Sequence, residues 1–263
     1  MIDHNLPDQA LPSADTAVPN VAWRPSPNFG PRADGAAVDI LLLHYTDMNS
    51  AEAAIRLLCD PAAQVSCHYV VAEDGTITQL VREGDRAWHA GAASWRGEGD
   101  INSRSIGIEI ANRGHDHGYP DFPDVQVDAV IALACDICAR HGIRRERILA
   151  HSDVAPARKR DPGEKFPWDR LASAGVGHYV DPEPIRGGRF FSPGESGAPI
   201  EALQGMLALY GYPLQITGTY DLETEQAVTA FQRHFRPARV DGVADSSTIA
   251  TLHRLARALT DAG

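Results

Sequence analysis

The chain has 263 residues, of which 43 % are hydrophobic, and a formal net charge of −11. This length exceeds one typical domain of about 100–200 residues, so one large and one small domain are expected. The acidic balance excludes a protein that binds the phosphate backbone of nucleic acid, because such binding needs clustered Lys and Arg.

Residues 1–36 are rich in Pro, Asn, Asp and Gly, and we interpret them as an extended arm lying on the first domain. Residues 1–20 have neither the basic stretch nor the apolar core of a secretory signal. No run approaches the ~20 apolar residues of a transmembrane helix. The sequence as written therefore predicts a cytoplasmic protein, and a periplasmic or exported form stays open.

Strand and helix patterns interleave over residues 37–180 and predict an α/β (α+β) fold, a central mixed β-sheet flanked by helices. Apolar or alternating runs predict strands at 38–46, 66–71, 76–81, 105–111 and 148–150. Helices are predicted at 50–58, with Ser50 as the N-cap, and at 124–141, where Gly142 ends the helix.

Residues 181–195 are dense in Gly and Pro and are predicted to be a linker. After them, residues 196–263 contain three helical patterns, at 199–210, 222–235 and 246–259. This part of the chain is therefore expected to form a small three-helix domain.

The four cysteines do not form a zinc site of the Cys type. Cys135 and Cys138 make a C-x-x-C, but they lie in the apolar helical run 124–141, where residues three apart share a face. No second C-x-x-C accompanies them, so we interpret them as buried residues of that helix.

His44, His151 and Asp161 form a candidate set of metal ligands. His44 lies near the end of the predicted strand 38–46, His151 follows the predicted strand 148–150, and Asp161 lies in a loop. Two imidazoles and one carboxylate are typical of catalytic zinc, which keeps a fourth position for water. Each residue also has an ordinary structural interpretation, since a histidine can end a strand without binding metal and Asp before Pro-Gly commonly forms a turn.

Five segments, in chain order, carry a resemblance to a known family. They are LLLHYTDM around His44, VSCHYVVAEDGTITQLV, WHAG at 88–91, SIGIEIANRG around Glu109, and AHSDVAPARKRDPGEKFPW around His151. Over residues 41–168 the chain resembles the AmpD/AmiD amidases of the peptidoglycan-recognition-protein and T7-lysozyme superfamily. SWRG at 94–97, ANRG after Glu109 and the helical module behind make the likeness greater to the AmiD branch.

The resemblance implies the fold, the reaction and the roles of five residues. The fold is a central mixed sheet with helices around it, and the reaction is hydrolysis of the amide between N-acetylmuramic acid and L-alanine. His44, His151 and Asp161 match the ligands of one zinc ion per chain. Glu109 matches the catalytic glutamate, and Lys159 matches the lysine that stabilises the oxyanion.

Three further positions concern the substrate or the branch of the family. His89, in WHAG, matches a residue that lines the substrate groove, and His68 faces either the cleft or the core; both are predicted substrate contacts. Cys67 departs from T7 lysozyme and several recognition proteins, which carry Tyr there. The AmpD/AmiD branch has a small residue at this place and uses the glutamate instead.

Residues 196–261 resemble the three-helix peptidoglycan-binding domain type 1, through LQGMLALYGY, TGTYDLETEQAVTAFQRHF and VDGVADSSTIATL. Asp221 is the expected N-cap of the second helix. The domain either binds glycan or has a structural role, and both interpretations stay open. The expected partners are peptidoglycan or muropeptide fragments, and the expected state is a monomer.

The sequence thus predicts a zinc-dependent N-acetylmuramoyl-L-alanine amidase acting on intact or 1,6-anhydro muropeptides in peptidoglycan turnover or recycling. A non-catalytic recognition protein is the first alternative, but such members lose a zinc ligand and all three positions match here. A zinc peptidase of another class would show a motif such as H-E-x-x-H, which the sequence lacks. A phage-type endolysin would share the same chemistry.

Overall fold

The computed structural model describes residues 14–188 and 190–261. Its larger part is built on a six-stranded sheet with the order β1-β5-β4-β7-β3-β8. The strands are β1 (Ala22–Trp23), β3 (Ile40–Tyr45), β4 (Tyr69–Val71), β5 (Ile77–Gln79), β7 (Ser105–Ile110) and β8 (Ile148–Ala150). Strands β4 and β5 pair antiparallel and the other neighbours pair in parallel, so the predicted mixed sheet is confirmed.

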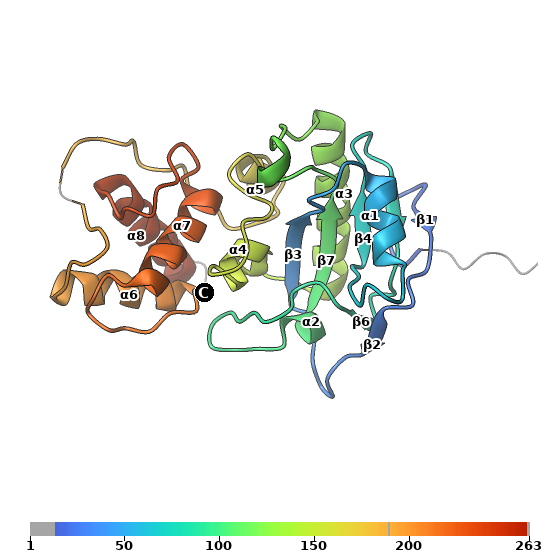
Figure 1. The fold of residues 1–263 in the computed structure, drawn as a ribbon, viewed down its shortest axis with the longest axis horizontal. Helices are drawn as coiled ribbons and strands as arrows, with labels where there is room; N and C mark the ends of the chain where they lie inside the picture. The colour runs from blue at the N-terminus through green and yellow to red at the C-terminus, as the bar shows by residue number, and fades with distance from the viewer. Residues whose placement is uncertain (1–13, 189, 262–263) are drawn as a thin grey trace, which may run out of the picture.

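Helices cover both faces of this sheet (Figure 1). They are α1 (Ala51–Leu58), α2 (Ile101–Arg104), α3 (Asp124–His141), α4 (His151–Val154) and α5 (Trp168–Ser173), with short 3₁₀ turns at His115–His117 and Arg145–Arg147. The Ser50 hydroxyl caps α1 by accepting from the Ala53 N–H at 3.2 Å, as predicted. Helix α3 has the predicted bounds and ends at Gly142, whose φ is 66°.

Alternation along β3 decides which side chains point to each of the two faces of the sheet. Leu41 and Leu43 pack with α3 residues in the core on one face of the sheet. Leu42 and His44 point to the opposite face, because successive strand residues alternate. The buried strand therefore presents one polar side chain on the face that α3 does not cover.

The N-terminal segment contributes to the sheet, which the sequence did not predict. Residues 1–13 of the expected arm lie outside the described residues. From residue 14 onward the chain follows the first domain, and β1 adds an edge strand parallel to β5. A second ribbon forms where β2 (Phe29–Pro31) pairs antiparallel with β6 (Asp85–Ala87). Part of the predicted arm is thus regular structure.

The three predicted C-terminal helices are confirmed as α6 (Ala198–Tyr210), α7 (Leu222–Phe235) and α8 (Ser246–Asp261). Asp221 caps α7 by accepting from the Thr224 N–H at 2.9 Å. Among the helices of the described residues, none has the length and apolar character needed to cross a membrane.

The helical bundle shares a hydrophobic core with the sheet domain. Leu42 and Val154 of the larger part belong to the same buried cluster as Leu207, Tyr212 and Phe231 of the bundle. Figure 1 shows the bundle beside α4, on the side of β3. The bundle therefore packs on the larger part as one body, while the boundaries 37–180 and 196–263 stay a prediction.

The four cysteines are free thiols. Cys67 is buried beneath the sheet face that α1 covers. Cys135 and Cys138 lie on α3 as predicted, but both are only partly buried. The prediction of two buried helix residues therefore needs correction, because both cysteines lie at the edge of the face of α3 that Val130, Ala134 and Ile137 bury.

Candidate metal centre and active site

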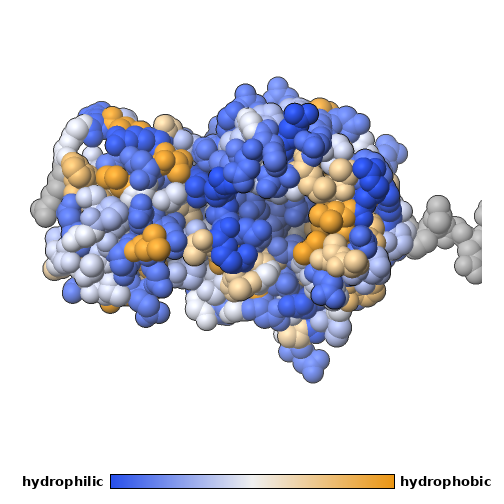
Figure 2. All heavy atoms as spheres, in the orientation of Figure 1, coloured by the Kyte–Doolittle hydropathy of each residue, from blue (hydrophilic) through white to orange (hydrophobic). Residues whose placement is uncertain are grey.

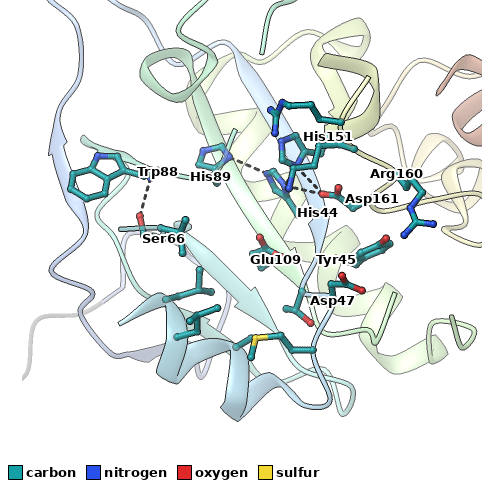
Figure 3. A pocket seen from close by; sticks show the side chains of 18 of the residues that line it. His44, Tyr45, Asp47, Ser66, Trp88, His89, Glu109, His151, Arg160 and Asp161 are labelled. Carbon is teal, nitrogen blue, oxygen red and sulfur yellow. Dashed lines mark hydrogen bonds and ion pairs between the residues drawn. The ribbon is translucent and has the colours of Figure 1, made fainter. Parts of the chain in front are cut away.

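The carboxyl ends of three neighbouring parallel strands carry three of the predicted site residues. Strand β3 lies between β7 and β8, and its His44 pairs in register with Glu109 of β7. Leu43 of β3 pairs with Ala150 of β8, the residue before His151. Residues paired in register point to the same face of a sheet, so His44 and Glu109 lie side by side. Figure 3 shows them at one edge of the pocket.

Asp161 joins the two histidines from a loop. The backbone N–H of Ser152 donates to the Asp161 carbonyl at 3.1 Å, which brings the loop back against the start of α4. The Nδ1 atoms of His44 and His151 lie 2.9 Å apart. The Asp161 Oδ2 lies 3.1 Å from His44 Nδ1 and 2.9 Å from His151 Nδ1. Three buried ligand atoms therefore converge on one point.

The spacing of these atoms fits a zinc ion. Zn–N and Zn–O bonds of about 2.0–2.1 Å at tetrahedral angles place ligand atoms about 3.3 Å apart. The observed separations of 2.9–3.1 Å are slightly shorter. A small outward movement of the side chains would admit the ion. The donor set of two imidazoles and one carboxylate is the one that catalytic zinc prefers.

The outer nitrogens of both histidines are already engaged, which fixes their orientation. His151 Nε2–H donates to the Ala90 carbonyl at 3.0 Å. His44 Nε2 lies 3.0 Å from His89 Nδ1, and His89 Nε2 lies 3.3 Å from the Ser105 hydroxyl. Partners of this kind select the tautomer whose other nitrogen faces a metal. Both Nδ1 atoms are thereby left to face the common point.

Electrostatics favours the metal-binding protonation states. Burial, together with the neighbouring His151, lowers the pKa of His44 to about 4, while Asp161 opposes this shift. Burial alone would raise the pKa of Asp161, but the His151 and His44 imidazoles hold it well below its ordinary value. At neutral pH the site therefore offers a neutral His44 and a carboxylate, the forms that bind divalent cations.

Glu109 is half-buried, and one of its carboxyl oxygens is fully buried. Its Oε2 has no hydrogen-bond partner among the described residues. Burial and the nearby Asp161 carboxylate raise the pKa of Glu109 well above its usual value, and Lys159 opposes this shift. A carboxyl with a raised pKa beside a metal site is suited to accept and return a proton near neutral pH.

Gly107 shares the sheet face of Glu109, because the two residues are two positions apart on β7. A Cβ on Gly107 would lie 2.6 Å from His89 Nδ1. The missing side chain therefore makes room for the His89 ring, which supports His44.

Lys159 and the rest of the predicted centre line one pocket of about 370 Å³. The lining also includes His89. The opposite wall is apolar and comes from α1 and the segment after it, where Leu57 and Val65 remain exposed. Figure 2 shows a hydrophilic hollow with an apolar patch at its edge on the α1 side.

His68 does not reach this pocket. Its side chain is fully buried, and its Nδ1 accepts from the Gly107 N–H at 3.0 Å. The Nε2 lies 3.1 Å from both the Asp85 carbonyl and the Arg32 guanidinium. Burial and the Arg32 charge lower the pKa of His68 to about 3. This placement supports a structural role, and nothing in the geometry supports the predicted substrate contact.

Sequence reasoning missed two features of the site. Arg158 donates to the carbonyls of Ala90 and Ala92, at 3.0 and 2.6 Å from its Nη2, and so holds the WHAG loop in place. No local signal distinguishes it from the other cations in RKR. The apolar wall had a weak signal, because Leu57 is an apolar residue on the exposed side of its helix and is 44 % exposed.

Comparisons with known proteins agree with this geometry. Residues 34–164 match the family model Amidase_2, N-acetylmuramoyl-L-alanine amidase. Residues 196–252 match PG_binding_1, a model for a peptidoglycan binding domain. N-acetylmuramoyl-L-alanine amidase AmiD of Escherichia coli (strain K12) is 38 % identical over 233 residues, which cover 83 % of this chain and 82 % of AmiD.

Solved structures show the same fold. E. coli AmiD, in complex with the substrate anhydro-N-acetylmuramic acid-L-Ala-D-gamma-Glu-L-Lys, matches with a TM-score of 0.71 and 37 % identity, over 86 % of this chain and 92 % of that one. AmpDh3 from Pseudomonas aeruginosa matches with a TM-score of 0.72 and 29 % identity, over 99 % of both chains. The chain therefore belongs to the N-acetylmuramoyl-L-alanine amidase family of enzymes.

Proposed function

We propose that the chain hydrolyses the amide bond between N-acetylmuramic acid, or its 1,6-anhydro form, and the L-alanine of the stem peptide, in peptidoglycan turnover or recycling. One zinc ion held by His44, His151 and Asp161 would serve the reaction. The observation that carries the proposal is the convergence of these three ligand atoms within 4.8 Å of one another, beside Glu109, whose Oε2 is buried.

The relatives support the class of substrate. The solved AmiD structure holds an anhydro-muramyl tripeptide, and AmpDh3 has been solved with an anhydromuramic pentapeptide. The pocket of this chain combines a polar floor with the apolar wall that includes Leu57 and Val65. Such a pocket suits a sugar and peptide amides on one side and the methyl groups of lactate and alanine on the other.

A bound zinc ion supplies a Lewis acid and lowers the pKa of water to about 7. Glu109 takes a proton from the attacking water and later gives it to the leaving L-alanine nitrogen. The raised pKa of Glu109 suits both steps, because the group must be a base first and an acid afterwards. Its place beside His44 in the sheet keeps it next to the reacting atoms.

Lys159 supplies positive charge for the oxyanion that forms on the amide carbonyl. It lines the same pocket as the three proposed zinc ligands. A fixed charge near a developing oxyanion is worth about 2.7–4 kcal/mol when one such group is removed. His89 acts from the other side of the pocket by holding His44. We also propose that the chain acts as a monomer.

The test is product analysis with controlled metal content. The protein is stripped with a chelator, then given zinc, and assayed on a soluble anhydro-muramyl peptide and on sacculi, with mass spectrometry of the products. Release of free stem peptide by the zinc-loaded protein alone is the expected result. Asp161→Asn should lose both zinc and activity, whereas Asp60→Asn, an exposed aspartate, should lose neither. Full hydrolysis by the stripped protein would refute the proposed zinc chemistry.

A further inference from the structure

Asp153 is a buried carboxylate on the helix that begins with a proposed metal ligand. Helix α4 spans only His151–Val154, and Asp153 within it has no exposed surface. Its Oδ2 accepts from the Ala150 N–H at 2.8 Å, which closes the first turn of the helix. A helix this short is not stable by itself, because one turn does not repay the cost of nucleation. Other parts of the chain must hold it.

The C-terminal bundle supplies two further donors to this carboxylate. The Tyr212 hydroxyl donates to Asp153 Oδ1 at 2.7 Å. His234 Nδ1, from α7, lies 2.7 Å from Asp153 Oδ2. With Ala150, three donors from two parts of the chain converge on one carboxylate.

Both donors are fixed by aromatic packing across the interface. The His234 ring stacks on Trp168 of α5, with 3.7 Å between ring centroids. Tyr212 packs edge-on against Trp95, with 5.2 Å between centroids. Gly211 allows this approach, because a Cβ there would lie 2.3 Å from the Trp95 ring. The two donors therefore have little freedom to leave Asp153.

We propose that Tyr212 and His234 are positioning residues for the metal centre, acting through Asp153 to hold α4 and thus the imidazole of His151. This inference rests on the proposed function, since it takes His151 as a zinc ligand. The bundle would then be part of the amidase centre in addition to any contact it makes with the cell wall.

The geometry around His151 explains how a change at Tyr212 or His234 would alter the position of the His151 imidazole. His151 is the first residue of α4, so a shift of this helix moves its imidazole directly. The ring has a second anchor, the bond from Nε2 to the Ala90 carbonyl. One anchor sets the ring plane and the other sets the backbone from which it projects. Partners behind metal ligands typically contribute about 10–100-fold to metal affinity or activity.

The bundle also offers a matched control. Tyr220 is buried like Tyr212, and its hydroxyl donates to the Gly242 carbonyl at 2.7 Å, inside the bundle. Tyr212→Phe and Tyr220→Phe therefore remove the same group from hydrogen bonds of equal length. His234→Phe removes the second donor and keeps a flat ring on Trp168, whereas His234→Asn keeps an N–H donor at the position of Nδ1.

The experiment measures zinc affinity of the full chain by competition with a chromogenic chelator, alongside urea unfolding and the rate of hydrolysis. Tyr212→Phe and His234→Phe are each expected to weaken zinc binding by about tenfold, the lower end of the usual range. His234→Asn should recover most of that loss. Tyr220→Phe should lower stability to a similar degree and leave zinc affinity unchanged.

Wild-type zinc affinity in both Tyr212→Phe and His234→Phe would overturn the inference, whatever their stability. Equal losses of affinity in Tyr212→Phe and Tyr220→Phe would also overturn it, because they would trace the effect to general loosening of the bundle. Failure of the wild-type chain itself to bind zinc would instead refute the proposed function. The two failures are therefore distinguishable in one titration.

Discussion

Glu109→Gln should lower turnover and, in the metal-free protein, raise stability. An amide cannot take a proton from water, and loss of a general base typically costs about 10²–10⁴ in rate. The Glu109 carboxyl also lowers the stability of the fold, because its Oε2 is buried and has no hydrogen-bond partner among the described residues. Activity and stability are therefore expected to move in opposite directions.

The size of the stability gain follows from that unpartnered oxygen. Leaving a buried polar group unsatisfied costs about 1–3 kcal/mol, and more when the group is charged. Glutamine keeps the shape and removes the charge, but it still buries a polar atom. We therefore expect a gain near the lower limit, about 1 kcal/mol, which corresponds to ~2–4 °C in the unfolding midpoint of a chain of this size.

The gain should depend on pH in a defined direction. The pKa of Glu109 in the folded state is raised well above its usual value by burial and by Asp161. At a pH below the unfolded-state pKa of about 4.3 the carboxyl is neutral in both states, so its ionisation does not affect stability. As the pH rises, the unfolded state releases the proton first, so wild-type stability falls until the folded state also ionises. The advantage of Gln therefore grows with pH and then levels off.

The assay is thermal unfolding of chelator-treated protein at several pH values, with turnover of the zinc-loaded enzyme measured in parallel. Glu73→Gln is the control, because it makes the same chemical change at an exposed turn. It should alter neither quantity. Wild-type turnover in Glu109→Gln would remove this residue from the mechanism, and a stability gain that does not change with pH would refute the account of its buried charge.

Three further predictions concern other residues of the described structure. Lys159→Ala should lower kcat by about 10²–10³ with zinc affinity retained; an unchanged kcat in steady-state assays would exclude an oxyanion role. Burial would raise the pKa of Glu83, but hydrogen bonds from Arg140 and other side chains outweigh burial and lower this pKa. The Glu83 carboxylate therefore stabilises the fold at pH values above its ordinary pKa of 4.5, and this stabilisation is lost as the pH falls. Glu83→Gln should therefore be less stable than wild type near neutral pH, by urea titration, and the difference should shrink on acidification; a difference independent of pH would contradict the linkage. Gly107→Ala should push the His89 ring away from His44 and weaken zinc binding by about tenfold, because a metal ligand loses its hydrogen-bond partner. The measurement is zinc affinity by competition with a chelator. A wild-type affinity would show that the His89 ring can move without affecting the metal site.

Removal of the C-terminal bundle is a poor test of glycan binding in this chain. Leu42 and Val154 of the larger part share a buried cluster with bundle residues such as Tyr212. Truncation would expose this apolar surface and leave Asp153 without two of its donors. Loss of activity on every substrate is the expected outcome, so point substitutions are more informative about the bundle.

The sequence predicted many of the helices and strands, because their bounds depend on residues within a few positions of each other. Helices α3 and α7 have the bounds predicted from their caps and periodicity, because Gly142 and Asp221 act on residues within a turn of themselves. The apolar run ending at His44 predicted the central strand, since a strand buried on both faces needs no polar positions. The motifs also named the three residues that converge in the pocket.

Only the tertiary structure decided what surrounds those residues. His68 and His89 look alike in the sequence, yet one is buried between a backbone amide and Arg32 and the other supports His44. Strand β1 and the contact of His234 with Asp153 join positions far apart in the chain. Periodicity and capping describe neighbours within a few residues, whereas sheet order, register and the docking of the bundle depend on which distant surfaces bury each other.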